Sequence, residues 1–106
     1  MQHRRFYVTT LTVDGEVLPS HGGDLVVARR VENPAIDWEL VHQTSEDVRL
    51  EPAPCPVEIG TPEGDFSGPA ILVRTDGRSH VFRGAGDLAG FGGFENEIEP
   101  GPDVEV

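Results

Sequence analysis

Two of the four histidines are the residues best placed to do chemistry, because an imidazole can exchange a proton near neutral pH. His42 falls in phase with Trp38 and Leu40 in a stretch where apolar and polar residues alternate. His80 falls in phase with Phe82 in a second stretch of this kind. Two histidines at inward-facing positions could flank a pocket and act as its acid and base. The competing interpretation places each ring at the rim of the core, with its nitrogens bonded to backbone or water.

Aromatic side chains could line such a pocket. A small β-barrel can hold one apolar ligand in its mouth, either as a carrier or as a cyclase or isomerase that acts by shaping the pocket. The candidates for ligand contact are Tyr7, Trp38, Phe66, Phe82, Phe91 and Phe94. Because a chain of 106 residues leaves little room beyond its own core, the alternative is that these rings fill the interior.

The remaining combinations of reactive residues predict neither a metal site nor a cofactor. His21 and Asp24 lie three residues apart, but no third ligand accompanies them. Asp37 and Glu39 alternate with apolar residues, as expected for the solvent face of a strand. The glycines of segment 84–86 are not followed by the third glycine and the helix of a dinucleotide-binding motif.

The charge balance excludes several classes of function. Nineteen acidic residues stand against eight basic ones, and all eight are arginine. Without lysine the chain cannot use Schiff-base or P-loop chemistry, and this absence suggests a GC-rich bacterial genome. A net charge of −11 disfavours binding to nucleic acid and to anionic membrane surfaces. The apolar runs are too short to span a bilayer or to form a signal core, so a cytoplasmic location is expected.

The elements that must position these residues are predicted to be short strands. Residues 5–13 are rich in β-branched and aromatic types, which favour a strand. Asp14-Gly15 then predicts a two-residue hairpin loop, with a return strand over 16–18 that ends before a proline. One continuous strand over 5–13 would place four residues on a single face: Tyr7, Thr9, Leu11 and Val13.

The middle of the chain predicts two further strands. Residues 20–23 are expected to form a loop. Residues 24–31 could form either a buried strand or a short helix, and the two adjacent valines favour the strand. Residues 37–44 alternate cleanly between apolar and polar types and therefore predict a strand.

The connecting segments have less regular patterns. Residues 48–50 could add a short strand, and the proline-rich segment 52–56 is expected to cross the surface. Cys55, the only cysteine, is expected there as a small, partly buried thiol. The glycine-rich segment 84–94 predicts irregular structure, and the acidic segment 95–106 predicts a frayed tail.

The clearest pattern is a three-stranded C-terminal meander. Its strands are expected at 57–59, 65–74 and 78–83, with turns at 61–64 and at Asp76-Gly77. A two-residue loop at Asp76-Gly77 would pair Thr75 with Arg78 and Val73 with His80. The expected core face therefore contains Ile71, Val73, His80 and Phe82, and the opposite face carries Ala70, Leu72, Val81, Arg74 and Arg83.

Together these patterns predict one all-β domain over 1–94. Gly68-Pro69 within the long strand suggests a bulge or bend that lets the sheet curl. We therefore expect a small antiparallel barrel or a folded-over sandwich of about six or seven short strands.

Two functions from different classes fit these patterns. The first is an acidic, non-catalytic interaction module, of the inhibitor, immunity or adaptor type, that docks a basic partner protein. The second is the small-molecule pocket described above. The alternative to the first is that the acidity only keeps a small protein soluble. A homodimer formed through an edge strand, either 37–44 or 78–83, is also expected.

Overall fold

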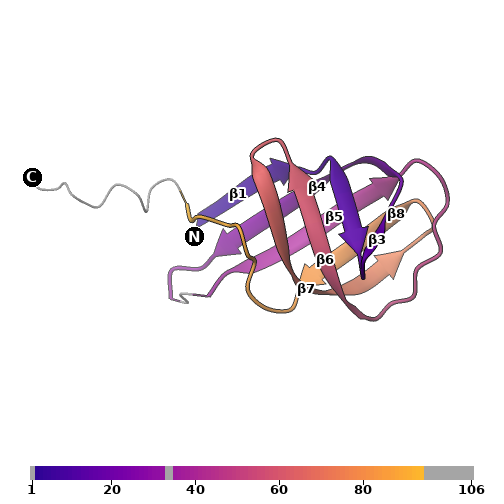
Figure 1. The fold of residues 1–106 in the computed structure, drawn as a ribbon. Coiled ribbons are helices and arrows are strands. Elements are labelled where there is room, and N and C mark those ends of the chain that lie inside the picture. Colours follow the sequence, from indigo (N-terminus) through magenta and orange to yellow (C-terminus); the bar gives the residue numbers. More distant parts are fainter. Residues whose placement is uncertain (1, 33–34, 95–106) are drawn as a thin grey trace, which may run out of the picture.

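The computed structural model describes residues 2–32 and 35–94, and this part of the chain contains eight β-strands and no helix (Figure 1). The predicted all-β class is confirmed, with eight strands in place of six or seven. The predicted tail at 95–106 lies outside the described residues. The strands are β1 (Gln2–Tyr7), β2 (Thr10–Val13), β3 (Glu16–Val17), β4 (Ser20–Arg29), β5 (Asp37–Thr44), β6 (Pro54–Thr61), β7 (Gly64–Thr75) and β8 (Ser79–Gly84).

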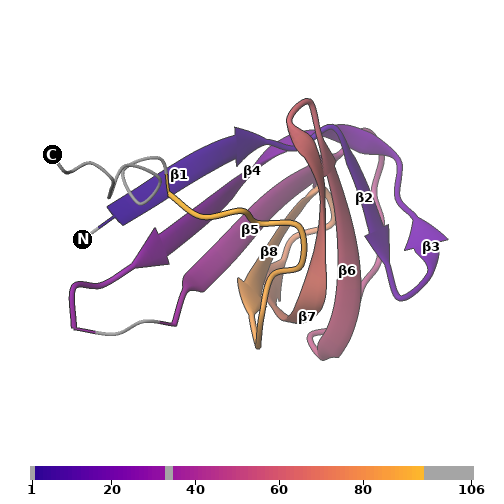
Figure 2. The ribbon, with the colours of Figure 1, turned by 60° about the vertical axis from the view of Figure 1, so that its left-hand side comes forward.

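All eight strands belong to one antiparallel sheet with the order β1-β4-β5-β8-β7-β6-β2-β3. β1 and β2 follow one another in the chain but lie near opposite ends of this order. The chain crosses between the ends at Val8 and Thr9. The amide of Val8 donates to the Gly23 carbonyl at 2.9 Å, and that of Thr9 donates to the Gly60 carbonyl at 2.8 Å. The sheet is therefore folded over on itself, although it does not close into a cylinder (Figures 1 and 2).

This crossing divides the single strand predicted over 5–13. Before it, the even-numbered residues Phe6 and Val8 are buried, whereas after it the odd-numbered Leu11 is buried. Tyr7, predicted to share a face with Leu11, is instead 57% exposed. A bend between two hydrogen-bonding partners changes which side chains point inward, and the residue types of the segment do not mark where it occurs.

The elements around the first hairpin largely follow the prediction. Asp14 and Gly15 both have positive φ (52° and 84°), as the predicted two-residue loop requires. Residues 24–31 form a strand rather than a helix, but β4 already begins at Ser20, so the loop predicted over 20–23 is wrong. A bulge near the start of β4 accommodates the glycines there. The strand at 37–44 is confirmed with the predicted bounds.

The fold encloses one apolar core between the two halves of the folded sheet. Leu25, Leu40, Phe82 and Leu72 form a continuous inward row across β4, β5, β8 and β7. Each of these four side chains is at most 2% exposed. The other buried apolar residues are Phe6, Val8, Leu11, Val13, Leu18, Val27, Trp38, Val57, Ile59, Phe66, Ala70, Leu88 and Phe94.

The predicted C-terminal meander is confirmed as β6, β7 and β8, but its second turn is centred one residue later than expected. The amide of Asp76 donates to the Ser79 carbonyl at 3.1 Å, so Gly77 and Arg78 form the two-residue loop. Gly77 has a positive φ of 100°, and such a turn takes glycine at its first central position. The Asp76 carboxylate fixes the turn by accepting from the amides of Arg78 and Ser79 at 3.1 and 2.7 Å.

A β-bulge in β7 moves part of the predicted core face to the solvent side. Leu72, not Ile71, pairs with Phe82, and Val73 is the extra residue of a β-bulge. Ile71 and Val73, predicted to be buried, are 40% and 47% exposed. His80 and Phe82 are buried as expected. The later turn alone would change the pairing by two residues and leave the alternation as predicted, whereas the extra residue of the bulge exchanges the two faces of the strand before it.

Three smaller predictions about the connecting segments are corrected. The sequence predicts a bulge or bend at Gly68-Pro69; Gly68 stays in regular register with Val57, so no bulge occurs there. Residues 48–50 form no strand, and β6 begins at Pro54 inside the segment expected to cross the surface. Cys55 is a free, half-buried thiol on β6, as expected.

The strands expected to mediate edge pairing are not at an edge. β5 lies between β4 and β8, and β8 lies between β5 and β7, so both have two hydrogen-bonded neighbours. The ends of the strand order are β1 and β3. Edge pairing through 37–44 or 78–83 is therefore excluded, because their backbone groups are already bonded.

The segment that follows β8 is irregular, as predicted, and crosses toward β1 (Figure 2). Ala89 exchanges backbone hydrogen bonds with Ser67 of β7, at 2.7 and 3.0 Å. Further on, the Phe91 ring lies 6.4 Å from the Phe6 ring of β1. Leu88 of this segment is buried, so the segment forms part of the core wall.

Candidate functional site

His42 and His80 lie directly opposite each other on β5 and β8, and both side chains are fully buried. β5 and β8 are neighbours in the middle of the sheet, and both histidines point inward from them. The register of the two strands therefore places the rings together. The sequence predicted that each points inward, and this is confirmed. It did not predict the pairing, which depends on β5 and β8 being neighbours.

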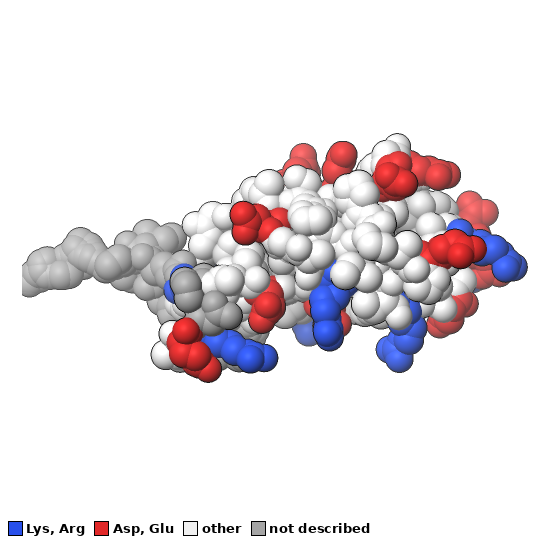
Figure 3. All heavy atoms as spheres, turned by 90° about the horizontal axis from the view of Figure 1, so that it is seen from below, with Lys and Arg blue, Asp and Glu red and all other residues white. Residues whose placement is uncertain are grey.

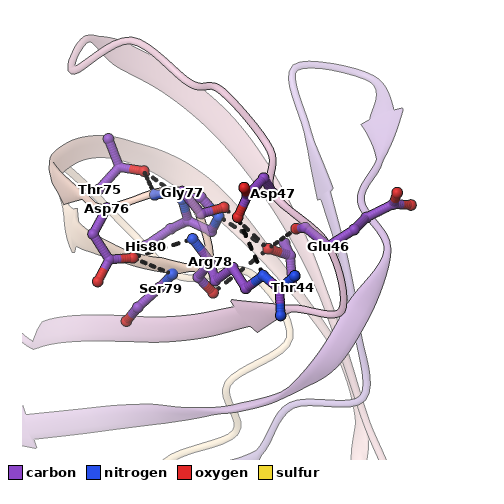
Figure 4. A network of polar contacts seen from close by, with 9 residues as sticks. All are labelled: Thr44, Glu46, Asp47, Thr75, Asp76, Gly77, Arg78, Ser79 and His80. Carbon is purple, nitrogen blue, oxygen red and sulfur yellow. Dashed lines mark hydrogen bonds and ion pairs between the residues drawn. The ribbon is translucent and has the colours of Figure 1, made fainter.

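His80 is held by two threonines (Figure 4). Its Nδ1 lies 2.7 Å from Thr75 Oγ1, and its Nε2 lies 3.4 Å from Thr44 Oγ1. The Thr44 hydroxyl also donates to the Glu46 carbonyl at 2.7 Å, which ties the ring to the loop after β5. Burial lowers the pKa of His80, and the nearby Asp76 carboxylate partly opposes this shift.

His42 has a less complete set of partners. Its Nε2 lies 2.9 Å from Ser20 Oγ, whereas its buried Nδ1 has no hydrogen-bond partner among the described residues. Burial, and secondarily the charge of His80, lower the pKa of His42 from 6.5 to about 4. The ring is therefore neutral at neutral pH. General bases work best when their pKa lies near the operating pH, so this environment is unfavourable for that role.

Two surface clefts lie near the histidine pair without including it. One, of about 330 Å³, is lined by His21, Gln43, Thr44, Ser45, Asp76, Arg78 and Ser79. The other, of about 390 Å³, is lined by Asp47, Val48, Arg49, Leu50, Thr75, Asp76 and Gly77. Neither imidazole contributes to these linings. The geometry supports a structural role for the pair, and its assignment as acid and base stays a prediction.

The aromatic candidates for ligand binding do not surround one opening. Trp38, Phe66 and Phe82 are core residues with at most 5% exposure, whereas Tyr7 points outward. Phe91 is half-buried and packs edge-on against Phe94, with ring centroids 5.1 Å apart.

One small cleft brings two of these rings together. Phe66 and Phe91 line a hollow of about 230 Å³ together with Phe6, Arg4, Glu63 and three glycines. Phe6, which the sequence did not single out, is its centre: its ring lies 4.8 Å from that of Phe66. The residue types around Phe6 do not alternate, since Tyr7 and Val8 follow it directly, so no signal in the sequence would have identified it.

The surface charges are distributed unevenly. Five of the nineteen acidic residues lie in 95–106, and the other fourteen are all exposed. Within the described residues, only two carboxylates form ion pairs: Glu63 with Arg4 at 2.7 Å and Asp47 with Arg78 at 3.1 Å. The remaining twelve are exposed and form no ion pair within this part of the chain.

One wall of the fold carries carboxylates and no arginine. It comprises β2, β3, β6 and residues 64–70 of β7, with the turn between β2 and β3, and its acidic residues are Asp14, Glu16, Glu58 and Asp65. We call these four residues the acidic wall. The arginines within strands lie on β1, β4, β8 and the far end of β7. Along the upper margin of the view in Figure 3 the charged side chains are all acidic, and the arginines visible on this face lie below it.

The remaining candidates show no further site. Among residues 2–32 and 35–94, no group of three or more His, Cys, Asp or Glu side chains could hold a metal ion, so His21 and Asp24 gain no third partner. The described chain also contains no helix long and apolar enough to cross a bilayer. Burial, and secondarily the charge of Asp14, raise the pKa of Cys55, which disfavours its thiolate form.

No protein-family model, no curated protein and no solved structure matches this chain.

Proposed function

We propose that this protein is a non-catalytic interaction module of the bacterial cytoplasm, which docks a basic partner protein on its acidic wall. The observation that carries the proposal is the segregation of charge. Four exposed carboxylates lie on strands and a turn that contain none of the eight arginines of the chain, and Arg4 of β1 pairs with Glu63 in the turn between β6 and β7. A surface of one sign attracts an oppositely charged partner and orients its approach.

The strand register places Glu58 and Asp65 on the outward side of the sheet, whereas Glu16 is paired with the buried Val13 and projects from the other side of its strand. Glu58 lies between Thr12 of β2 and Ser67 of β7, and Asp65 lies in the next row beside Gly60. The small neighbours leave the carboxylates accessible to long guanidinium or ammonium side chains from a partner. None of the four makes an ion pair within the described chain.

Solubility alone explains this arrangement less well. An even spread of acidic residues would keep a small protein soluble, whereas a wall free of arginine creates a directional field. The pocket alternative gains less support, because Trp38, Phe66 and Phe82 are packed in the core. The low pKa of the buried His42 likewise favours a non-catalytic role.

The test compares two variants with the same change in net charge. The first neutralises the acidic wall with Asp14→Asn, Glu16→Gln, Glu58→Gln and Asp65→Asn. The control neutralises four exposed carboxylates outside the wall, with Glu32→Gln, Glu46→Gln, Glu51→Gln and Asp87→Asn. Each protein is immobilised and exposed to a lysate of the native host at low and at high salt.

We expect the unmodified protein and the control to retain a basic protein at low salt and to release it at high salt. The wall variant should bind that protein roughly tenfold more weakly, since exposed charge pairs contribute about 0.2 to 1 kcal/mol each. Equal loss in both variants would mean that only net charge matters. Failure to recover any salt-sensitive basic protein would also reject the proposal.

A further inference from the structure

The side of the sheet away from the core carries a symmetric pattern across β4, β5, β8 and β7. In one row of paired residues the order is Asp24, Val41, Val81 and Arg74. In the neighbouring outward row the order is Val26, Glu39, Arg83 and Ile71. Between these rows lies the buried row that begins with Leu25, which confirms that both point outward. We call these eight residues the four-strand face.

When the order of residues in either row is reversed about the line between β5 and β8 and laid over the original row, each acidic residue meets an arginine and each aliphatic residue meets another aliphatic residue. In the first row the outer positions are Asp24 and Arg74, and the inner positions are both valine. In the second row the outer positions are aliphatic, and the inner positions are Glu39 and Arg83. Acidic residues therefore lie on the β4–β5 half and arginines on the β8–β7 half.

From this pattern we infer that the protein forms a symmetric homodimer in which two four-strand faces pack against each other. A two-fold axis parallel to the strands, between β5 and β8, brings β5 of one protomer over β8 of its partner. Glu39 then faces the partner's Arg83, and Asp24 faces the partner's Arg74. Val41 and Val81 meet their counterparts in the same way, so the contact is isologous. Sheets pack in this aligned manner in β-sandwiches.

The charges of the face are free to make these contacts. Among the described residues, Asp24, Glu39, Arg74 and Arg83 form no ion pair within the chain, even though Glu39 and Arg83 are cross-strand neighbours. Opposite charges that stay unpaired within one protomer can pair across an interface without breaking an existing contact.

The apolar residues of the face supply area for burial. Ile71 is 40% exposed, and Val26, Val41 and Val81 are half-buried. Val73, the bulged residue beside them, is 47% exposed. A hollow of about 390 Å³ at one end of the face is lined in part by Val26, Glu39 and Arg83, and it leaves space for partner side chains. Since eight residues a side make a small interface, we expect weak association that depends on protein concentration.

This contact differs from the edge pairing expected from the sequence, and it uses a surface separate from the acidic wall. The dimer and the docking of a basic protein can therefore succeed or fail independently. In the homodimer both acidic walls remain on the outside of the assembly and available to partners.

The experiment measures molar mass by light scattering over a concentration series that extends to about the millimolar range, where even a weak dimer is populated. Three variants accompany the unmodified protein. Arg83→Glu places like charges across the two-fold axis. The double variant Glu39→Arg/Arg83→Glu restores opposite charges in the swapped order. Arg49→Glu makes the same change in net charge on an exposed loop residue outside the face.

We expect a monomer–dimer equilibrium for the unmodified protein and for Arg49→Glu. Arg83→Glu should weaken dimerisation roughly tenfold or more, and the double variant should recover most of the affinity. Thermal melts of each variant identify any that fail to fold. A monomer at every concentration, an unaffected Arg83→Glu dimer, or a folded double variant without recovery would each overturn the inference.

Discussion

At the scale of single residues, the notable feature is a pair of neutral imidazoles inside a very acidic protein. His42 and His80 lie in phase with the core residues of β5 and β8, and their hydroxyl partners come from Ser20, Thr44 and Thr75. If either ring were protonated, its positive charge would be buried away from water and would lie opposite the second imidazole, and burial of a charge is unfavourable. Burial therefore keeps both pKa values below the ordinary value.

Acid should destabilise the protein through His42. Below pH 6.5 the unfolded chain binds a proton at this residue, whereas the folded chain does not until about pH 4. Stability from the neutral ring is thus fully present above pH 6.5 and declines as the pH falls toward 4. The loss over this window is about 3 kcal/mol for His42, and His80 adds to it. Urea denaturation between pH 7 and pH 4 measures the effect.

The variant His42→Gln should flatten this pH dependence, because glutamine has similar polarity and does not titrate. His3→Gln, which changes an exposed histidine, serves as the control and should retain the full dependence. If the slope is the same in all three proteins, carboxylates rather than the buried pair govern acid sensitivity.

The hydroxyl of Thr75 should contribute to stability through His80. Thr75→Val keeps the shape of the side chain but removes the 2.7 Å contact with Nδ1, leaving that buried nitrogen without its partner. We expect a loss of about 1 to 2 kcal/mol in the free energy of unfolding. Thr12→Val, at a threonine without a side-chain hydrogen bond among the described residues, should change it little. Equal effects of both substitutions would contradict this role.

At the scale of elements, local residue chemistry predicted strand locations better than strand register. The predicted two-residue loop at Asp14-Gly15 is confirmed, since both residues adopt the positive φ that such pairs favour. At the second hairpin the same dipeptide type occurs, but the Asp76 carboxylate caps the amides of Arg78 and Ser79 and moves the loop one residue onward. That competition between two turn geometries is not visible in the alternation of the strands.

The candidate site was predictable in part for a related reason. Alternation along one strand identifies which side chains point inward, and this placed His42 and His80 correctly. Whether two inward residues meet depends on strand order, which is set by contacts distant in sequence. β5 and β8 are neighbours in the sheet although at least 35 positions separate them in the sequence. The sequence therefore identified two candidate residues but not their pairing.

Gly84 should be essential to the end of β8. A methyl group there would lie 2.4 Å from the indole ring of Trp38, which is buried and donates to the Gly86 carbonyl. Gly84→Ala should therefore displace the ring and cost about 2 to 3 kcal/mol. Because Trp38 is the only tryptophan, its fluorescence should also shift to longer wavelength.

The matched control for this prediction is Gly92→Ala. A methyl group at Gly92 would meet nothing within 4 Å, so stability and fluorescence should be unchanged. Unchanged fluorescence in Gly84→Ala would show that the backbone adjusts without moving the indole.

At the scale of the whole molecule, the folded sheet separates two kinds of surface. The acidic wall carries a single sign of charge, whereas the four-strand face carries both signs beside aliphatic residues. Composition predicted the net charge of −11, but not its segregation. Segregation arises because the arginine-free segments 6–28 and 50–73 supply β2, β3, β6 and the start of β7, which the sheet order brings together.

The division between the two surfaces leads to a prediction about salt. Contact of a basic partner with the acidic wall should weaken steeply as salt rises, because all of its charges are exposed and unpaired. Dimerisation through the four-strand face should weaken less, since half of its eight residues are apolar. Light scattering and partner capture over the same salt series would detect the difference, and parallel decline of both would contradict it.

The most direct test of the account is to observe which surface a basic ligand contacts. Backbone amide shifts of the labelled protein can be followed by NMR during titration with an arginine-rich peptide at low salt. We predict that the largest changes occur between Thr10 and Val17 and between Glu58 and Asp65, and that added salt reverses them. Changes centred on β4, β5 and β8, or spread evenly over all exposed carboxylates, would contradict a binding function for the acidic wall.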